Sequence, residues 1–347
     1  MQYNISDMEN KIKAELEKTN EILLWAHKQD ISGLKRFLEE EAEKPLICIG
    51  SGGSFSICKL ISLMYSTRKG LGTAITPYSI YSISEEVLKN CKILLVSNSG
   101  HNKDITSIAK KCVQINPDWT ANLTTADGTK NDLKKIISPG NSFNYESGIK
   151  DGFISLNSVT ANYALALKAF KGDFEINFKN SEPNGNFDYQ GINHYIVLYG
   201  GWGEPAALDF ESKMVETGIA TCAISDYRNF CHGRFIFAGN HCGHEKKVNI
   251  PNDCVVVMIM TPREASFAEK IKDILPERCS KIIIETFADG AAASLEFMLK
   301  ASELVGFIAS QNGINPMSPP NHGPIDKLKP IQIPFISDLK KSGPLSI

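Results

Sequence analysis

The sequence lacks several features that would place it in a specialised class. No apolar run approaches the roughly 20 residues needed to span a membrane, and the start, Met1-Gln2-Tyr3-Asn4, lacks the basic segment and apolar core of a secretory signal. The nine cysteines are scattered without a framework, which favours a reducing compartment over a disulfide scaffold. The net charge of -2 indicates no general attraction to nucleic acid or anionic lipid. We therefore expect a cytoplasmic protein with free thiols that binds neither membrane nor nucleic acid.

The remaining composition is that of a soluble globular protein, with 42% hydrophobic and 22% charged residues. A chain of 347 residues has room for two domains of ordinary size. Residues 4 to 43 show helical periodicity, which is interrupted near Gln29-Asp30-Ile31-Ser32. We expect two helices in this segment, with Asp30 or Ser32 as a cap.

From residue 45 the pattern changes to short apolar strands that alternate with helices. Such alternation predicts a parallel sheet with helices on both faces. In this first half we predict strands at 45–49, 74–76, 92–96 and 120–123, and helices at 55–67, 103–113, 131–137 and 158–170.

The same order of elements returns after a segment rich in Gly, Pro and polar residues. Strands are predicted at 195–199, 254–260 and 281–285, and helices at 206–216 and 291–311. The two halves therefore look like distant copies of one another. We predict a helical lead at 1–43, a first α/β domain at 44–172, a linker at 173–192, a second α/β domain at 193–311 and a proline-rich tail at 312–347.

Two polar turns of the first half have the composition of an anion site. One is Gly50-Ser-Gly-Gly-Ser54 and the other begins Ser97-Asn-Ser-Gly, and each joins a strand to a helix. Glycines let the backbone approach a ligand, helix-terminal N–H groups point at it, and hydroxyls add donors. Both turns lie at the carboxyl edge of the predicted sheet, where ligands of such sheets bind. Neither turn has the spacing of a dinucleotide fingerprint or a P-loop.

A second group of candidate residues lies in the second half. Asp209, Lys213 and Glu216 are spaced by four and three residues, which puts them on one face of a predicted helix. His232 follows Glu216 by 16 residues and precedes a glycine, so we expect it on a loop. A carboxylate and a histidine are the minimum equipment for acid–base chemistry on a sugar or carbonyl compound. The same spacing also fits a solvated, salt-bridged surface.

These residues carry a resemblance to the SIS (sugar isomerase) domain family. The strand–Gly-Ser-Gly-Gly-Ser–helix unit followed by strand–Ser-Asn-Ser-Gly resembles its phosphate loops, and the second half resembles the isomerase half of glucosamine-6-phosphate synthase and related deglycases. The resemblance covers roughly residues 45 to 335. It implies two doubly wound, flavodoxin-like parallel-sheet subdomains of the α/β class in tandem, with no metal or organic cofactor.

The resemblance also implies roles for residues of this chain. It implies that Glu216 moves a proton between C1 and C2 of a sugar, and that His232 opens the ring from the neighbouring subunit of a homodimer. The charge on the intermediate would be stabilised by Lys213 or by the tail residue Lys329, for which Lys327 is the alternative match. The phosphate of the sugar would be bound by Ser51, Gly52, Gly53, Ser54, Ser97, Asn98, Ser99 and Asn102.

Two positions depart from the family pattern. His101-Asn102 replaces the residues that usually end the second turn, where a threonine hydroxyl binds phosphate in the family. Asn102 can still donate through its amide. The alternative is a pocket adapted to a ligand other than a hexose 6-phosphate. Arg228 lies in a loop that differs from the synthase, and it can hold a carboxylate or a second phosphate, or form a surface ion pair.

Three further features of the sequence have simple structural explanations. His241-Cys-Gly-His244-Glu245 brings potential metal ligands together, but no second pair follows at zinc spacing, so we predict no metal. His322 is interpreted as a turn residue. Trp202 is expected to fill the ligand position of the second half, which leaves one site built mainly from the loops of the first half.

The function predicted from these observations is a sugar-phosphate isomerase, deaminase or deglycase that acts through an enediol or enediolamine intermediate. One alternative is a sugar-phosphate or nucleotide sensor that keeps the fold without the catalysis. Another is a nucleotide-processing or defence-associated protein, suggested by the altered second turn and by Arg228. Retention of both Glu216 and His232 favours the enzyme.

Overall fold

The computed structural model describes residues 12–40, 43–125, 131–148, 151–172, 174, 176, 187–241, 254–319 and 328. The chain divides into two compact units. The first, named here the sheet A unit, comprises Asn20–Lys150, Asn157–Phe174 and Pro320–Ile347. The second, the sheet B unit, comprises Met1–Thr19, Asp151–Leu156 and Glu175–Pro319. Each unit is therefore assembled from separate stretches of the chain.

Sheet A is a five-stranded sheet in the order β2-β1-β3-β4-β5, and all its neighbouring strands are parallel. Every residue of β1, β3 and β4 is buried. Strands covered on both faces read as continuous apolar runs, and β1 and β3 have such runs. The strands are β1 (Leu46–Ile49), β2 (Gly72–Ile75), β3 (Lys92–Val96), β4 (Thr120–Thr124) and β5 (Ser142–Asn144).

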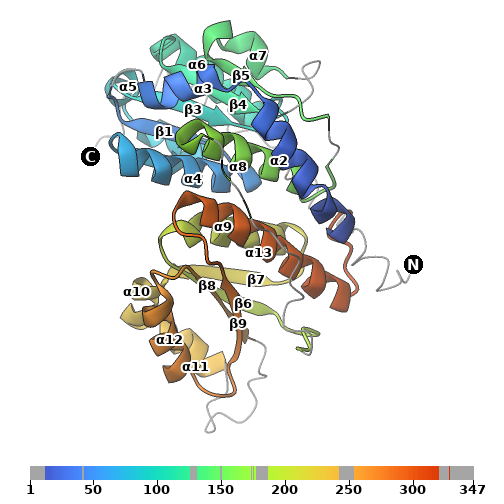
Figure 1. Ribbon diagram of the computed structural model, residues 1–347. Coiled ribbons are helices and arrows are strands. Elements are labelled where there is room, and N and C mark those ends of the chain that lie inside the picture. The colour runs from blue at the N-terminus through green and yellow to red at the C-terminus, as the bar shows by residue number, and fades with distance from the viewer. Residues whose placement is uncertain are drawn as a thin grey trace. The chain divides into compact units, whose positions relative to one another are not determined.

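Helices cover both faces of sheet A. Alternate residues of β1 and β3 pack into one core cluster with side chains of α5, α6 and α7, while α4 and α8 lie on the opposite face (Figure 1). The covering helices are α4 (Gly53–Arg68), α5 (Glu85–Lys89), α6 (Lys103–Ile115), α7 (Leu133–Ile136) and α8 (Leu156–Lys171).

Two lysine contacts, one of them buried, attach the N-terminal helices to the rest of the sheet A unit. Lys168 of α8 donates to the carbonyls of His27 and Gln29 at 2.5 and 2.8 Å, at the end of α2 (Thr19–Lys28). A cation is favourable there because the last carbonyls of a helix have no intrahelical partner. Lys92, which is 0% exposed, donates to the Phe37 carbonyl at 2.6 Å after α3 (Ser32–Lys35). The predicted break near residue 30 is thus the point where these helices turn.

Sheet B has four parallel strands in the order β7-β6-β8-β9. This order repeats that of β2-β1-β3-β4, so the predicted similarity of the two halves is confirmed at the level of topology. The strands are β6 (His194–Tyr199), β7 (Thr221–Asp226), β8 (Cys254–Met260) and β9 (Ser280–Glu285).

The helices of the sheet B unit also form two layers, with α9 and α13 on one face of the sheet and α10, α11 and α12 on the other (Figure 1). Alternate residues of β6 and β8 pack with side chains of α10, α11 and α12 in a single cluster. Most residues of the 21-residue helix α13 are buried. The helices are α9 (Glu204–Glu216), α10 (Tyr227–Asn229), α11 (Phe235–His241), α12 (Ala265–Ile274) and α13 (Ala291–Gln311).

The architecture confirms the predicted α/β class with two parallel-sheet subdomains. In the described part of the chain, no helix combines the length and the apolar character that a membrane span requires. The described end of the predicted linker packs onto α13, because the Tyr189 N–H donates to Gln311 Oε1 at 2.7 Å and Asn312 Nδ2 donates to the Tyr189 carbonyl at 3.2 Å. The exact domain boundaries stay a prediction.

Candidate functional site

The two polar turns of the first half follow neighbouring strands of sheet A. β1 and β3 are parallel neighbours, with Ile49 opposite Leu95. The chain leaves β1 towards β2 on one side and leaves β3 towards β4 on the other. In an open α/β sheet, the crevice for ligands lies outside the carboxyl ends of two strands that diverge in this way. Figure 1 shows these strands within the sheet A unit.

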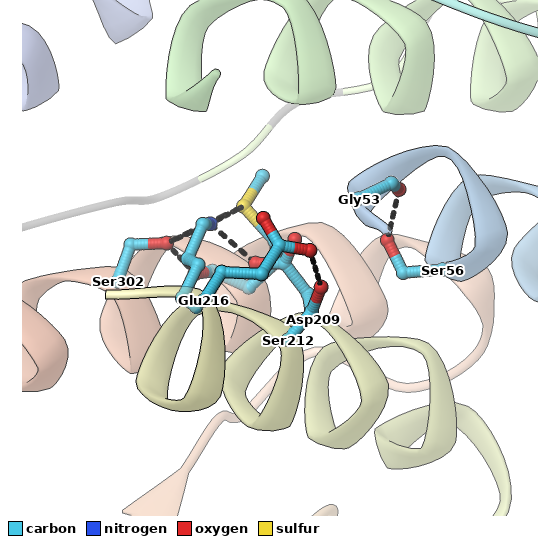
Figure 2. Close-up of polar contacts among 8 residues, drawn as sticks. Gly53, Ser56, Asp209, Ser212, Glu216 and Ser302 are labelled. Atoms are coloured by element: carbon cyan, nitrogen blue, oxygen red, sulfur yellow. Dashed lines mark hydrogen bonds and ion pairs between the residues drawn. The ribbon is translucent and has the colours of Figure 1, made fainter. Parts of the chain in front are cut away.

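The first turn, Gly50 to Gly53, leads into the 16-residue helix α4. Gly52 has φ +54° and ψ −137°, a conformation that favours glycine. The Ser54 N–H donates to the Ser51 carbonyl at 3.1 Å, and Ser56 Oγ donates to the Gly53 carbonyl at 2.8 Å (Figure 2). Ser51 is exposed, so its hydroxyl is available at the positive end of the helix dipole.

The second turn opens α6 and is closed by its own side chains. Ser97 Oγ accepts a hydrogen bond from the Gly100 N–H at 3.1 Å. Asn102 Oδ1 accepts from the N–H groups of Asp104 and Ile105 at 2.9 and 3.2 Å, which makes Asn102 the N-cap of α6. Its oxygen therefore serves the helix, and its Nδ2 is the donor that it can offer to an anion.

A polar network that the sequence did not predict supports this turn from β4 and β5. Asn131 Nδ2 donates to Thr124 Oγ1 at 2.8 Å and to Asn144 Oδ1 at 2.7 Å. The Gly100 carbonyl accepts from the N–H groups that follow Asn131. Gly100 has φ +66°, and a Cβ at this position would lie 2.3 Å from Asn131 Oδ1. The turn and the network therefore require glycine at residue 100.

We expect Gly100→Ala to lower the free energy of unfolding by about 2–5 kcal/mol, the sum of left-handed backbone strain and overpacking. Gly148→Ala is the matched control, because Gly148 has φ +67° and nothing within 4 Å of the position of a Cβ. It should lose only the strain, about 1–2 kcal/mol. Urea denaturation of both variants measures the difference, and equal losses would contradict a packing role for Gly100.

In the sheet B unit, Asp209 and Lys213 form a buried ion pair. Lys213 is 3% exposed and Asp209 is 1% exposed. Lys213 Nζ donates to Asp209 Oδ2, to Ser302 Oγ of α13 at 2.7 Å, and contacts Met298 Sδ at 4.0 Å (Figure 2). An ammonium has three protons, and this environment engages all of them. Lys213 therefore connects α9 to α13.

Burial raises the pKa of the Asp209 carboxyl, and the Lys213 ammonium opposes that shift. The second carboxylate oxygen, Asp209 Oδ1, is buried and has no hydrogen-bond partner among the described residues. The pair is thus a costly structural element of the interior and not a solvated surface bridge.

The other candidate catalytic residues of this unit are exposed. Glu216 is the last residue of α9, and its Oε1 accepts a hydrogen bond from Ser212 Oγ at 2.6 Å (Figure 2). His232 lies at a kink in a helical segment, with φ −90° and ψ 25°, next to Gly233 at φ 118°. Arg228 is exposed on α10. The carboxylate of Glu216 and the ring of His232 are therefore accessible to a ligand or a partner.

Several predicted features lie outside the described residues. These are Lys329, the alternative Lys327, the turn residue His322, and Cys242, His244 and Glu245 of the histidine–cysteine cluster. Within the described ranges, no three His, Cys, Asp or Glu side chains are grouped to hold a metal ion. Eight of the cysteines are described, and they are free thiols.

The corresponding edge of sheet B carries the carboxylate of Glu264. A Cβ on Gly200, after β6, would lie 2.3 Å from Glu264 Cγ, so the Glu264 side chain covers this glycine. Glu264 Oε2 accepts from the Thr261 N–H at 3.0 Å, after β8. Trp202 is partly exposed, and its carbonyl accepts from Ser294 Oγ at 2.6 Å. The Glu264 side chain thus lies against Gly200 and Gly201, and its charge disfavours an anion, while the role expected for the Trp202 ring stays a prediction.

Among the comparisons with known proteins, only the comparison with solved structures finds matches. No protein-family model matches the chain. No curated protein matches its sequence either.

Solved structures match over most of the chain. Tagatose-6-phosphate ketose/aldose isomerase from Escherichia coli has a TM-score of 0.62 at 16% identity, covering 90% of this chain and 96% of that one. Glucosamine-6-phosphate deaminase from Thermotoga maritima has a TM-score of 0.60 at 15% identity, covering 91% and 97%. The C-terminal domain of glucosamine-fructose-6-phosphate aminotransferase from Francisella tularensis has a TM-score of 0.57 at 10% identity, covering 87% and 95%.

These matches extend across both parallel sheets and their helices. At such low identity they establish the architecture, while the residues of the candidate site are assigned by chemistry. The chain has the fold of the phosphosugar isomerases, and its predicted resemblance to SIS domain proteins is confirmed at the level of fold.

Proposed function

We propose that the protein binds a phosphorylated sugar at the carboxyl edge of sheet A, with the phosphate held by the turns after β1 and β3. The observation that carries this proposal is the pairing of two hydroxyl- and amide-rich turns at neighbouring strands, each opening a helix of at least 13 residues. Backbone N–H groups and the helix dipoles favour an anion there. Proteins of this fold that are named for sugar phosphates support the choice of ligand.

We further propose that the protein is an aldose–ketose isomerase or a deaminase that moves a proton through an enediol or enediolamine. Glu216 is the base and His232 the ring-opening residue, as the SIS resemblance implies. Both side chains are exposed, as a residue that meets a substrate must be. His232 would come from the neighbouring subunit, so we propose a homodimer, and sedimentation equilibrium should give twice the 38.2 kDa chain mass. A measured mass equal to that of one chain would contradict the proposed homodimer.

A non-catalytic sugar-phosphate sensor is the second candidate. The observation that favours it is the burial of Lys213, because an ammonium held by Asp209 and Ser302 is not free to stabilise a reaction intermediate. An enzyme would then need the charge from elsewhere, and the remaining candidates are Lys329 and its alternative Lys327. The two functions share the phosphate site and differ only in turnover.

Ligand binding is tested first by thermal denaturation. Fructose 6-phosphate, tagatose 6-phosphate and glucosamine 6-phosphate should each be compared with the unphosphorylated sugar. Stabilisation follows RT ln(1 + [L]/Kd), about 2.7 kcal/mol at a hundredfold excess over Kd. We expect the melting temperature to rise with a phosphorylated sugar and not with its unphosphorylated form. Equal responses to both forms would contradict a phosphate site.

Ser51 and Ser99 provide the variants that locate the site. Their hydroxyls have no hydrogen-bond partner in the described part of the structure, so Ser51→Ala and Ser99→Ala should leave the fold intact. A hydrogen bond to a charged group contributes about 1.5–3 kcal/mol, so each variant should bind about tenfold to a hundredfold more weakly. Ser66→Ala, at the other end of α4, is the control and should bind like the wild type.

A further inference from the structure

Asn162 of α8 is a fully buried amide next to the second phosphate turn. It is 0% exposed. Its Nδ2 lies 2.9 Å from Asn98 Oδ1, 3.1 Å from Thr125 Oγ1 and 2.9 Å from the Ser158 carbonyl. Asn98 and Thr125 follow β3 and β4, so this one side chain joins two neighbouring loops at the carboxyl edge of sheet A to the helix α8.

The surroundings fix the orientation of the Asn162 amide. The two ends of an asparagine amide are distinguished by their hydrogen-bond partners, and the Ser158 carbonyl can only accept. The opposite orientation would set Asn162 Oδ1 against that carbonyl oxygen, so Nδ2 must face it. This orientation costs free energy, because it leaves Asn162 Oδ1 buried without a hydrogen-bond partner among the described residues. A buried acceptor without a partner costs about 1–3 kcal/mol.

The orientation of Asn162 determines the orientation of Asn98. Because Asn162 presents a donor, Asn98 must present its oxygen, and it does so at 2.9 Å. The Asn98 NH₂ group is then directed away from Asn162. Asn98 is partly exposed and lies between Ser97 and Ser99 in the turn. An NH₂ group there can donate to an anion, whereas a carbonyl oxygen in the same place would repel it.

We propose that Asn162 is a positioning residue that holds the Asn98 amide so that its NH₂ donates to the phosphate of the ligand. Asn162 touches no ligand itself and acts only through Asn98. The effect is selection for anions at this turn. The inference rests on the proposed phosphate site and adds the residue that gives its second turn the correct polarity.

A double-mutant cycle tests this link, with inorganic phosphate as the probe and calorimetric titration as the measurement. Asn98→Ala should weaken phosphate binding about tenfold to a hundredfold, the loss of one charge-assisted hydrogen bond. Asn162→Leu should weaken it about threefold to tenfold, because the Asn98 amide is then free to rotate. In the Asn98→Ala background, Asn162→Leu should change the affinity by less than about twofold, since interacting residues are not additive.

A second variant covers the case in which leucine disturbs the fold. Asn162→Asp keeps the size but replaces the donor with acceptors, so Asn98 should turn its NH₂ inward and expose its oxygen. Phosphate binding should then fall further than with leucine. Circular dichroism checks that this variant folds, because an aspartate oxygen in the place of Nδ2 also faces the Ser158 carbonyl. In the Asn98→Ala background, the loss with aspartate should be smaller than in the wild type.

The outcomes separate the inference from the proposed function. A wild-type protein that binds no phosphate removes both. Wild-type binding, with the same loss for Asn162→Leu whether it is made alone or together with Asn98→Ala, removes only the positioning role, because a general structural effect does not depend on Asn98. Unchanged binding by Asn162→Leu and Asn162→Asp removes it as well.

Discussion

Lys213→Met should lower the free energy of unfolding by about 3–5 kcal/mol, the usual cost of removing one partner of a buried ion pair. Methionine fills a similar volume but leaves the Asp209 carboxylate uncompensated in an environment where Asp209 is 1% exposed. It also removes the donor to Ser302 Oγ, which ties α9 to α13. Urea denaturation monitored by circular dichroism measures the loss.

Two matched variants identify the cause of that loss. Asp209→Asn combined with Lys213→Met has no buried charge, so the double variant should lose less than half as much as Lys213→Met alone. Lys135→Met removes the ammonium of an exposed pair, in which the side chains are 71% and 49% exposed, and should cost at most about 1 kcal/mol. A loss for Lys213→Met no larger than for Lys135→Met would show that the buried pair contributes little.

The destabilisation by Lys213→Met should depend on pH. Burial raises the pKa of the Asp209 carboxyl and Lys213 opposes the shift, so removing Lys213 raises this pKa further. A carboxyl with a raised pKa in the folded state stabilises the fold when protonated, and this contribution is lost as the pH rises. The difference between Lys213→Met and the wild type should thus be smallest near about pH 4 and increase towards neutral pH. A difference independent of pH would contradict a role for the Asp209 charge.

The sequence predicts the central parts of both sheets because buried parallel strands have a simple signature. β1, β8 and the last four residues of β3 are continuous apolar runs that end in polar or glycine-rich turns. The predicted bounds of the long helix α13 are those that the structure gives it. Edge strands carry a weaker signal. β5 has only three residues, and β7 alternates exposed and partly buried positions, so the sequence predicts neither.

The candidate site shows where local spacing stops being informative. Asp209 and Lys213 at i and i+4 fit a surface pair and a buried pair equally well, and the decisive partner, Ser302, is 89 residues away. Asn98 is predicted from its turn, whereas Asn162, which orients it, is 64 residues further along the chain. Turns at strand ends can be recognised from sequence because their glycine and serine residues follow one another in the chain. The side chains that support them come from other elements and need the fold.

Glu216→Gln should slow the proposed proton transfer by about 10²–10⁴-fold while leaving sugar-phosphate binding within about twofold of the wild type. Glutamine keeps the size of the side chain and can still accept from Ser212 Oγ, which donates to Glu216 Oε1 at 2.6 Å. What it loses is the ability to take a proton from carbon. Proton NMR in D₂O with the sugar phosphates that stabilise the protein measures this directly, as loss of the C2 proton signal of glucosamine 6-phosphate or of a C1 proton signal of the two ketose phosphates.

Glu211 is the matched control, because it lies on the same helix and its carboxyl has a raised pKa, caused first by burial and then by the charge of Glu216. Such a carboxyl is a chemically competent base, so Glu211→Gln tests whether the assignment belongs to Glu216. Exchange by wild type and Glu211→Gln but not by Glu216→Gln would establish Glu216 as the base. Equal exchange by wild type and Glu216→Gln would contradict the assignment of Glu216 as the base. Binding without exchange in any of the three proteins would identify a sensor, because the phosphate turns of sheet A work without the chemistry of α9.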